Sequence, residues 1–228
     1  MMRAFFRVAW QVMRKDMTVE IRSREILLTT LLFAVSVVLI FSFALVREGR
    51  APDDVAAGIL WVAISFSGTL AMGRTFERER YNDTLRALIL APADRPAIYV
   101  GKLLGLLLLM LLVEIVLVPM VGLLFAAPIF AYPGMLLMLL VSGTLGFAAV
   151  GTLFAAMLVR VRSRDTLLPV LLYPITVPVM IGGVRGTAAL FQAVPDEPMA
   201  RFWIGLLLFW DAIFVTLALW TFEPVMTE

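Results

Sequence analysis

Six long apolar stretches divide the chain and limit what it can fold into. Each is close to the roughly 20 residues that a helix needs to cross a bilayer. They cover residues 26–46, 55–73, 103–127, 133–159, 166–184 and 202–222. The chain of 228 residues is 62% hydrophobic and only 16% charged, which excludes a soluble globular protein. We expect an all-α polytopic membrane protein with a single transmembrane domain over residues 1–228.

The distribution of basic residues predicts the orientation of the chain. Loops that stay in the cytoplasm are rich in Lys and Arg. Of the 19 Lys and Arg residues, 15 lie before the first span, between spans two and three, or between spans four and five. With six spans, this distribution places both termini in the cytoplasm.

The first 25 residues predict an amphipathic helix that lies in the membrane interface. Apolar and polar side chains recur at helical spacing on different faces of this segment. The apolar set is Phe6, Trp10, Met13, Met17 and Ile21, and the polar set is Arg7, Gln11, Arg14, Thr18 and Arg22. The alternative is a positively charged flank that only sets the topology.

The longest polar connection, residues 74–101, predicts a docking surface for a cytoplasmic partner. Its charged first part, residues 74–80, also fits an ordinary exposed end of the second span. Docking is favoured by an apolar ridge that a plain solvated loop would not carry. This ridge consists of Leu85, Leu88, Ile89 and Leu90.

The residue types that most enzymes and metal sites need are missing. The chain has no His and no Cys, which removes imidazole bases, thiolate nucleophiles, zinc sites and the usual ligands of haem iron. A Walker A loop is also missing, because Pro96 and Leu103 stand where the motif around Gly101-Lys102 needs a glycine and a hydroxyl. A net charge of +2 excludes a broad basic surface for nucleic acid. We therefore expect no catalytic or metal-binding residue, and any ATP hydrolysis must occur on another chain.

Two carboxylates lie deep in apolar spans, Glu114 in the third and Asp211 in the sixth. An ionised group is costly at this depth, so both residues are candidates for an ion or proton path. Neither has an obvious intramembrane cation as partner. A structural role, with a protonated carboxyl or a hydrogen bond inside the bundle, is the favoured alternative.

Two further patterns concern how the helices bend and pack. Prolines inside a helix remove backbone hydrogen bonds, and three of them in the fifth span predict a kinked helix with a hinge at Pro169, Pro174 and Pro178. Small residues at i, i+4 spacing allow helices to approach closely, either within the chain or between two copies. They are Ser65, Thr69 and Gly73 in span two, and Ser142, Gly146 and Ala149 in span four.

Several stretches carry a family resemblance. They are Pro52 with Gly58-Ile-Leu-Trp-Val62, the run from Arg74-Thr-Phe76 through Asp83-Thr-Leu85 to Leu90-Ala-Pro92, Gly101-Lys102, and Leu167-Leu-Pro-Val-Leu-Leu-Tyr-Pro-Ile-Thr-Val-Pro178. Together they resemble the cytochrome c maturation protein B family, which is also called heme exporter protein B. The resemblance extends from the amphipathic start to the sixth span, and the triple-proline fifth span is its most specific part.

The resemblance implies a non-catalytic permease subunit of ABC-2-type, type V exporter-like fold in the bacterial inner membrane. In this family the permease pairs with an ATPase, maturation protein A, as two permeases with two ATPases, and the wider complex includes maturation proteins C and D. ATP hydrolysis is tied to release of the haem-loaded chaperone, maturation protein E, so that haem is attached to apocytochromes c outside the membrane. The chain itself would bind no cofactor, because ATP binds to the ATPase and partner proteins carry haem.

The resemblance also implies which residues dock into the ATPase. The matching positions are Arg74, Phe76, Asp83 and Leu85, and Leu88 belongs to the same ridge. This chain has Glu77-Arg-Glu-Arg80 where some members have paired acidic residues after the Phe.

Two other hypotheses compete with the permease. One is a self-contained secondary transporter that couples to ions through Glu114 and Asp211. The other is an intramembrane enzyme, which is the weakest because the chain offers no His or Cys and no sign that the two carboxylates meet.

Overall fold

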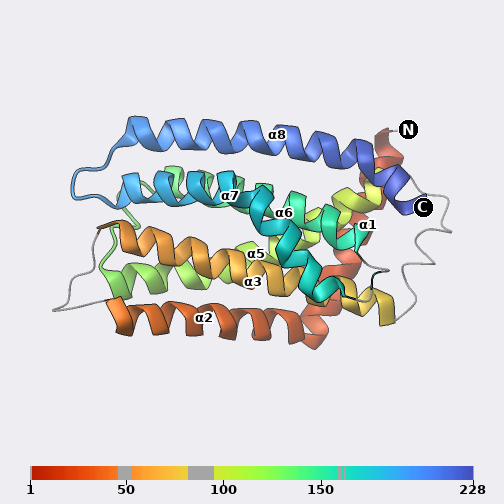
Figure 1. The fold of residues 1–228 in the computed structure, drawn as a ribbon, viewed down its shortest axis with the longest axis horizontal. Helices are drawn as coiled ribbons and strands as arrows, with labels where there is room; N and C mark the ends of the chain where they lie inside the picture. Colours follow the sequence, from red (N-terminus) through yellow and green to blue (C-terminus); the bar gives the residue numbers. More distant parts are fainter. Residues whose placement is uncertain (1, 46–52, 82–94, 159–160, 162, 228) are drawn as a thin grey trace.

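The structure, a computed structural model, describes residues 2–45, 53–81, 95–158, 161 and 163–227. Within these ranges the chain is helical and contains no strand. Six helices are long and apolar enough to cross a membrane, which confirms the predicted all-α polytopic fold. The helices, labelled as in Figure 1, are α1 (Met2–Ser23), α2 (Glu25–Leu45), α3 (Asp53–Tyr81), α5 (Arg95–Phe125), α6 (Pro133–Met157), α7 (Arg164–Phe191) and α8 (Glu197–Thr227).

The six long helices run side by side, and α1 lies across one end of the bundle (Figure 1). Helices α3 and α6 are central, with 67% and 72% of their apolar windows buried. Helices α2 and α8 form opposite edges, and only 28% and 22% of their windows are buried. The two central helices therefore carry most of the packing, and the edge helices leave their outer faces to lipid.

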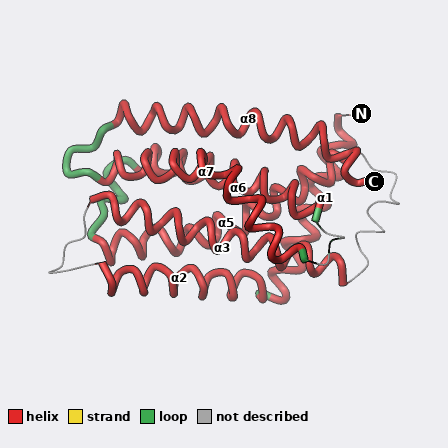
Figure 2. The backbone as a smooth tube through the Cα atoms, in the orientation of Figure 1, coloured by secondary structure: helices red, strands yellow, loops and turns green. Residues whose placement is uncertain are grey.

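Both termini lie at the same end of the bundle, as an even number of spans predicts (Figure 1). Helix α3 ends and α5 begins at this end. At the opposite end, short loops over residues 126–132 and 192–196 join α5 to α6 and α7 to α8 (Figure 2). We call the end that carries both termini the terminal end of the bundle.

Two helices extend beyond the apolar stretches that predict them. Helix α3 continues to Tyr81 and α5 begins at Arg95, so both flanks of the connection expected at residues 74–101 are helical. Lys102, expected just before the third span, lies inside α5 with 4% of its surface exposed. Hydropathy does not reveal these turns, because their charged residues lower the average over a window.

A sharp break separates α1 from α2. Arg24 adopts a left-handed conformation with φ of 54°, which turns the chain from the end of the bundle into its long axis. The carboxylate of Glu20 accepts a hydrogen bond from the backbone N–H of Leu27 at 2.8 Å. This contact satisfies one of the N–H groups that the first turn of α2 leaves without an intrahelical partner.

Helix α7 remains helical through all three of its prolines. Figure 1 shows α7 changing direction along its length rather than running straight. Proline inside a helix removes one backbone hydrogen bond and crowds the preceding turn, which accounts for a bend. Pro169, Pro174 and Pro178 therefore lie in a bent helix, and their action as a hinge stays a prediction.

Trp61 of α3 is the point at which three helices meet. Its side chain is fully buried, and its Nε1–H donates a hydrogen bond to Thr187 Oγ1 of α7 at 2.9 Å. The ring occupies the space that a Cβ atom would need at Gly143 of α6 and at Gly183 of α7. On α6, Gly146 likewise packs against Val179 and Asp211 of the same chain. The small residues of α6 therefore allow close contacts within the chain.

We expect Gly183→Ala to destabilise the bundle by about 1–3 kcal/mol, because the added methyl group overlaps the Trp61 ring and that ring is held from both sides. Thermal unfolding in detergent, followed by size-exclusion chromatography, would measure the change in midpoint. The matched control is Gly205→Ala on α8, where no atom lies within 4 Å of the new methyl group. Equal midpoints for the two variants would contradict the packing role of Trp61.

Candidate functional site

The predicted docking residues lie in the last turns of α3 or after that helix. Arg74 belongs to α3 and its side chain is exposed. Phe76 also lies in α3, where only its backbone is described, and Asp83, Leu85 and Leu88 fall outside the described residues. The docking contact therefore stays a prediction. The helices that flank it, α3 and α5, are placed at the terminal end of the bundle (Figure 1).

Arg164 connects the first turn of α7 to α3 beside this segment. Its side chain is buried, and its Nη2 donates to the backbone carbonyl of Gly73 at 2.7 Å. Its Nε contacts Oδ1 of Asp165 at 3.3 Å. Sequence reasoning counted Arg164 only as a topology signal. A basic residue that opens an apolar span next to an acidic residue is the signal that could have found it.

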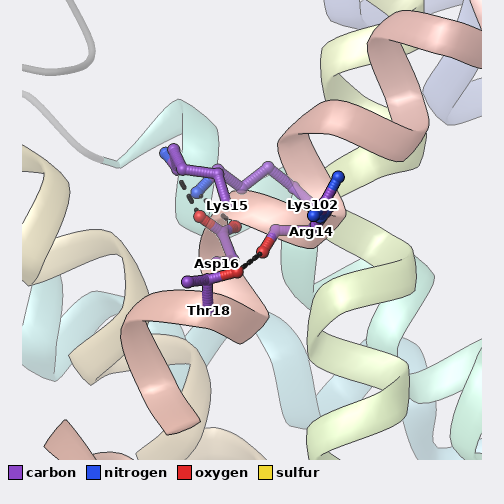
Figure 3. A network of polar contacts seen from close by, with 5 residues as sticks. All are labelled: Arg14, Lys15, Asp16, Thr18 and Lys102. Atoms are coloured by element: carbon purple, nitrogen blue, oxygen red, sulfur yellow. Dashed lines mark hydrogen bonds and ion pairs between the residues drawn. The ribbon is translucent and has the colours of Figure 1, made fainter. Parts of the chain in front are cut away.

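A second polar contact joins α1 to α5, and Figure 3 shows it. Lys102 Nζ of α5 lies 2.7 Å from Oδ2 of Asp16 on α1, and Lys15 Nζ lies 3.1 Å from the other oxygen, Oδ1. Lys102 is 4% exposed and Asp16 is 14% exposed, so this ion pair is largely removed from water. From the sequence, Lys102 is noted as part of the Gly101-Lys102 pair but without a partner, and Asp16 is not singled out.

Glycines bring the two helices close enough for this ion pair to form. A Cβ atom at Gly101 would lie 2.6 Å from the carbonyl oxygen of Ala9 and 2.7 Å from Cβ of Val12. A Cβ atom at Gly105 would lie 3.7 Å from the side chain of Asp16. Helix α1 therefore crosses α5 at a glycine-lined surface and places its carboxylate against Lys102.

The contact with α5 uses a face of α1 that differs from both faces predicted from the sequence. Ala9, Val12 and Met13 are buried together with Glu20, and Asp16 lies on the same face. Of the predicted apolar face, Met13 is buried and Met17 is half-buried, whereas the remaining members are exposed, namely Phe6, Trp10 and Ile21. The exposed members stay available to lipid, and the buried face holds α1 on the bundle.

Glu114 lies on the α5 face that packs against α6. It is buried, and its Oε1 accepts a hydrogen bond from Thr144 Oγ1. Within the described part of the chain its other oxygen, Oε2, has no hydrogen-bond partner. Glu114 is therefore joined to α6 by one hydroxyl group, and its role as an ion path or a packing residue stays a prediction.

Asp211 of α8 lies against the opposite side of α6. A Cβ atom at Gly146 would lie 2.5 Å from Oδ1 of Asp211, and neither carboxyl oxygen has a hydrogen-bond partner among the residues described. Thr144 and Gly146 are two residues apart on α6, which separates them by about 200° around the helix. The structure therefore places Glu114 and Asp211 on different sides of α6 and does not bring them together.

The described residues also contain no group of three acidic side chains that could hold a metal ion. Buried ion contacts lie at Lys102 and Arg164 at the terminal end, and side-chain hydrogen bonds such as Trp61–Thr187 and Thr144–Glu114 lie deeper in the bundle. These contacts join α1 to α5, α3 to α7 and α5 to α6.

A bundle of six apolar helices with an added helix across one end defines a multi-pass helical membrane protein. Residues 7–225 match the family model of the CcmB protein, and the chain belongs to this family.

Individual relatives agree with this assignment. The chain is 26% identical to Heme exporter protein B of Haemophilus influenzae over 171 residues, which cover 75% of this chain and 77% of that protein. It is 27% identical to Heme exporter protein B of Pseudomonas aeruginosa over 167 residues, covering 73% and 74%. With Heme exporter protein B of Rhodobacter capsulatus it shares 28% identity over 193 residues, covering 83% and 88%. The similarity therefore spans most of each chain.

We expect Asp16→Ala to destabilise the protein by about 3–5 kcal/mol, because Lys102 then keeps a buried charge without the carboxylate that faces it. The matched control is Lys15→Ala, which removes the more exposed cation from the same carboxylate and should cost at most about 1 kcal/mol. Thermal unfolding of both variants in detergent measures the difference. A midpoint for Asp16→Ala equal to that of Lys15→Ala would contradict the role of the Asp16–Lys102 pair.

Proposed function

We propose that this chain is the permease subunit of an ABC transporter complex that handles haem for cytochrome c maturation. The observation that carries the proposal is the match to the CcmB family over residues 7–225. Relatives that cover most of the chain are named Heme exporter protein B. The chain has no Walker A loop, so a partner ATPase, maturation protein A, hydrolyses ATP.

The ATPase docks on residues 82–94 and the adjoining end of α3. Arg74, Phe76, Asp83, Leu85 and Leu88 make this contact. Two features of the described helices support transmission of movement from there. Arg164 ties α3 to α7, and the Asp16–Lys102 pair ties α1 to α5. Closure of the ATPases would then move packed helices together rather than displace one loop.

Haem is carried by partner proteins, and this chain binds no cofactor of its own. The absence of His and Cys supports a subunit that transmits force over one that ligates iron. The complex contains two permeases and two ATPases together with maturation proteins C and D. ATP hydrolysis releases the haem-loaded chaperone, maturation protein E, outside the membrane.

The protein resides in the bacterial inner membrane with both termini in the cytoplasm. Most basic residues fall in segments at the terminal end of the bundle, and basic segments stay in the cytoplasm. Docking of a cytoplasmic ATPase requires the same orientation, because the proposed docking segment joins α3 to α5 at that end.

The test is affinity purification of the tagged protein in mild detergent, with mass spectrometry of partners and an ATPase assay on the eluate. Recovery of a Walker-motif ATPase together with maturation proteins C and D is the expected result. An ATPase-free homo-oligomer with no nucleotide hydrolysis would overturn the proposal.

Replacing Leu85 and Leu88 by Asp should abolish co-purification of the ATPase, because two charges replace the apolar ridge at the proposed contact. Membrane insertion should persist, since both positions lie outside the apolar spans. The matched control replaces both residues by Met, which keeps the ridge apolar and should retain the ATPase. Unchanged recovery of the ATPase with the Asp variant would remove the docking assignment.

Release of the haem-loaded chaperone should largely survive the double substitution Glu114→Gln with Asp211→Asn. The amide oxygen of Gln can still accept the hydrogen bond from Thr144, and an ion path is not part of the proposed mechanism. Chaperone release and the level of the protein in the membrane are both measured.

A comparison of two variants in thermal unfolding tests whether Asp211 acts in packing. Gly146→Val should reduce stability more than Asp211→Asn, because the larger side chain pushes against the Asp211 carboxyl and the neighbouring Val179.

For the double variant Glu114→Gln with Asp211→Asn, complete loss of chaperone release at a normal protein level would favour ion coupling instead.

A further inference from the structure

A cavity of about 540 Å³ lies between α2, α3 and α7 near the terminal end of the bundle. It borders the predicted docking segment, since Arg74 lines it, and all of its lining residues are described and come from three spans. Its outer wall includes Phe33 of α2 and Phe66 of α3, which are 41% and 48% exposed. A hollow that is flanked by exposed aromatic side chains on membrane-spanning helices faces the lipid rather than the core.

The cavity spans the depth of a lipid headgroup and the upper part of an acyl chain. Asp165 lies in the first turn of α7, and Tyr173 lies eight residues further along, about 12 Å deeper into the bundle. Leu168 and Pro169 form an apolar wall between these levels. At the level of Tyr173, Thr69 Oγ1 and Tyr173 OH lie 3.2 Å apart and provide hydroxyl groups that can donate to lipid oxygens.

Among the residues described, two arginines and one aspartate lie at or beside the shallow end of the cavity. Arg74 lines this end with an exposed side chain, and none of the described residues pairs with it. Arg164 lies immediately beside it, since it donates to the carbonyl of Gly73, which also lines the cavity. Arg164 is 5% exposed, and its Nη1 has no hydrogen-bond partner in the described structure. Asp165 offsets only one of these two cations.

We propose that this cavity binds one anionic glycerophospholipid from the leaflet at the terminal end of the bundle. The lipid phosphate lies at Arg74, with the buried Arg164 as a second positive charge behind the wall, its glycerol region lies near Thr69 and Tyr173, and an acyl chain fills the space beside Phe33. A free phosphate would match the arginines but would leave the apolar part of the cavity empty. A single lipid matches both the charge and the apolar depth.

Gly73 provides a direct way to close the cavity. It lines the cavity, and no atom lies within 4 Å of a Cβ atom built there. The Cβ atom of Gly73→Leu therefore meets open space, the rest of its side chain would occupy cavity volume, and Leu is a better helix former than Gly. Gly205→Leu on α8 is the matched control, because it also has open space around its Cβ atom but lies outside the cavity.

The experiment uses the full chain in nanodiscs of phosphatidylcholine that contain a minor share of photoactivatable phosphatidylglycerol or, in parallel, photoactivatable phosphatidylcholine. Lipid adducts are mapped by peptide mass spectrometry. We expect adducts on residues 165–173 with about a fivefold excess for phosphatidylglycerol, the ratio that one cation near an anionic headgroup supports. Gly73→Leu should remove these adducts, Gly205→Leu should not, and Arg74→Gln should reduce the preference between the two lipids while keeping the adducts.

Three outcomes would overturn the proposal. One is equal labelling by both lipids in the unmodified chain, which indicates ordinary bulk lipid. Another is loss of the adducts when inorganic phosphate is added, which assigns the arginines to a free anion. The third is a copy-to-copy cross-link, in place of lipid adducts, from a photoreactive residue introduced at Phe33, which assigns the cavity to an interface between two copies of this chain.

Discussion

Close contact between helices is the constraint on which this structure depends. Lipid is as apolar as a leucine side chain, so a bundle in a bilayer gains little from hiding apolar surface and must gain from tight packing. Trp61 meets this need at the centre of the bundle, where glycines on α6 and α7 leave room for its ring and Thr187 satisfies its N–H. This contact joins the two most buried helices, α3 and α6, to α7.

Close approach of helices also brings charged groups into contact at the terminal end. Gly101 lets α1 approach α5 until Asp16 reaches Lys102, and the buried Arg164 reaches the backbone of α3. These contacts are costly to break, because each buried charge would lose the group that faces it. Helices that are tied in this way move together, which suits a subunit driven from its terminal end by a partner. The deeper carboxyls, Glu114 and Asp211, lie on opposite sides of α6 and are not part of these ties.

The sequence predicts the helices well because each span must satisfy its own backbone hydrogen bonds, and this requirement leaves a long apolar stretch in the chain. The sequence predicts the helix ends less well where helices extend past the apolar stretch. The turns at Arg95 to Lys102 and the end of α3 carry charges that hydropathy counts against a helix. The candidate docking residues could be proposed only from the resemblance and the apolar ridge, because no local pattern describes a contact with another chain. Arg164 and Asp16 escaped notice for a related reason, since their partners lie 91 and 86 residues away along the chain.

The sequence by itself determined that this chain has six membrane-spanning stretches, that it contains no His and no Cys, and that its termini share one side. These properties depend on composition and on the order of residues along the chain, and they need no knowledge of which helices touch. Only the tertiary structure decided that Trp61 joins α3, α6 and α7, that Lys102 is buried against Asp16, and that a cavity with Arg74 at one end opens between α2, α3 and α7. Such features depend on which faces of different helices meet, and that choice is made by side-chain shape across distant parts of the chain rather than by any local pattern.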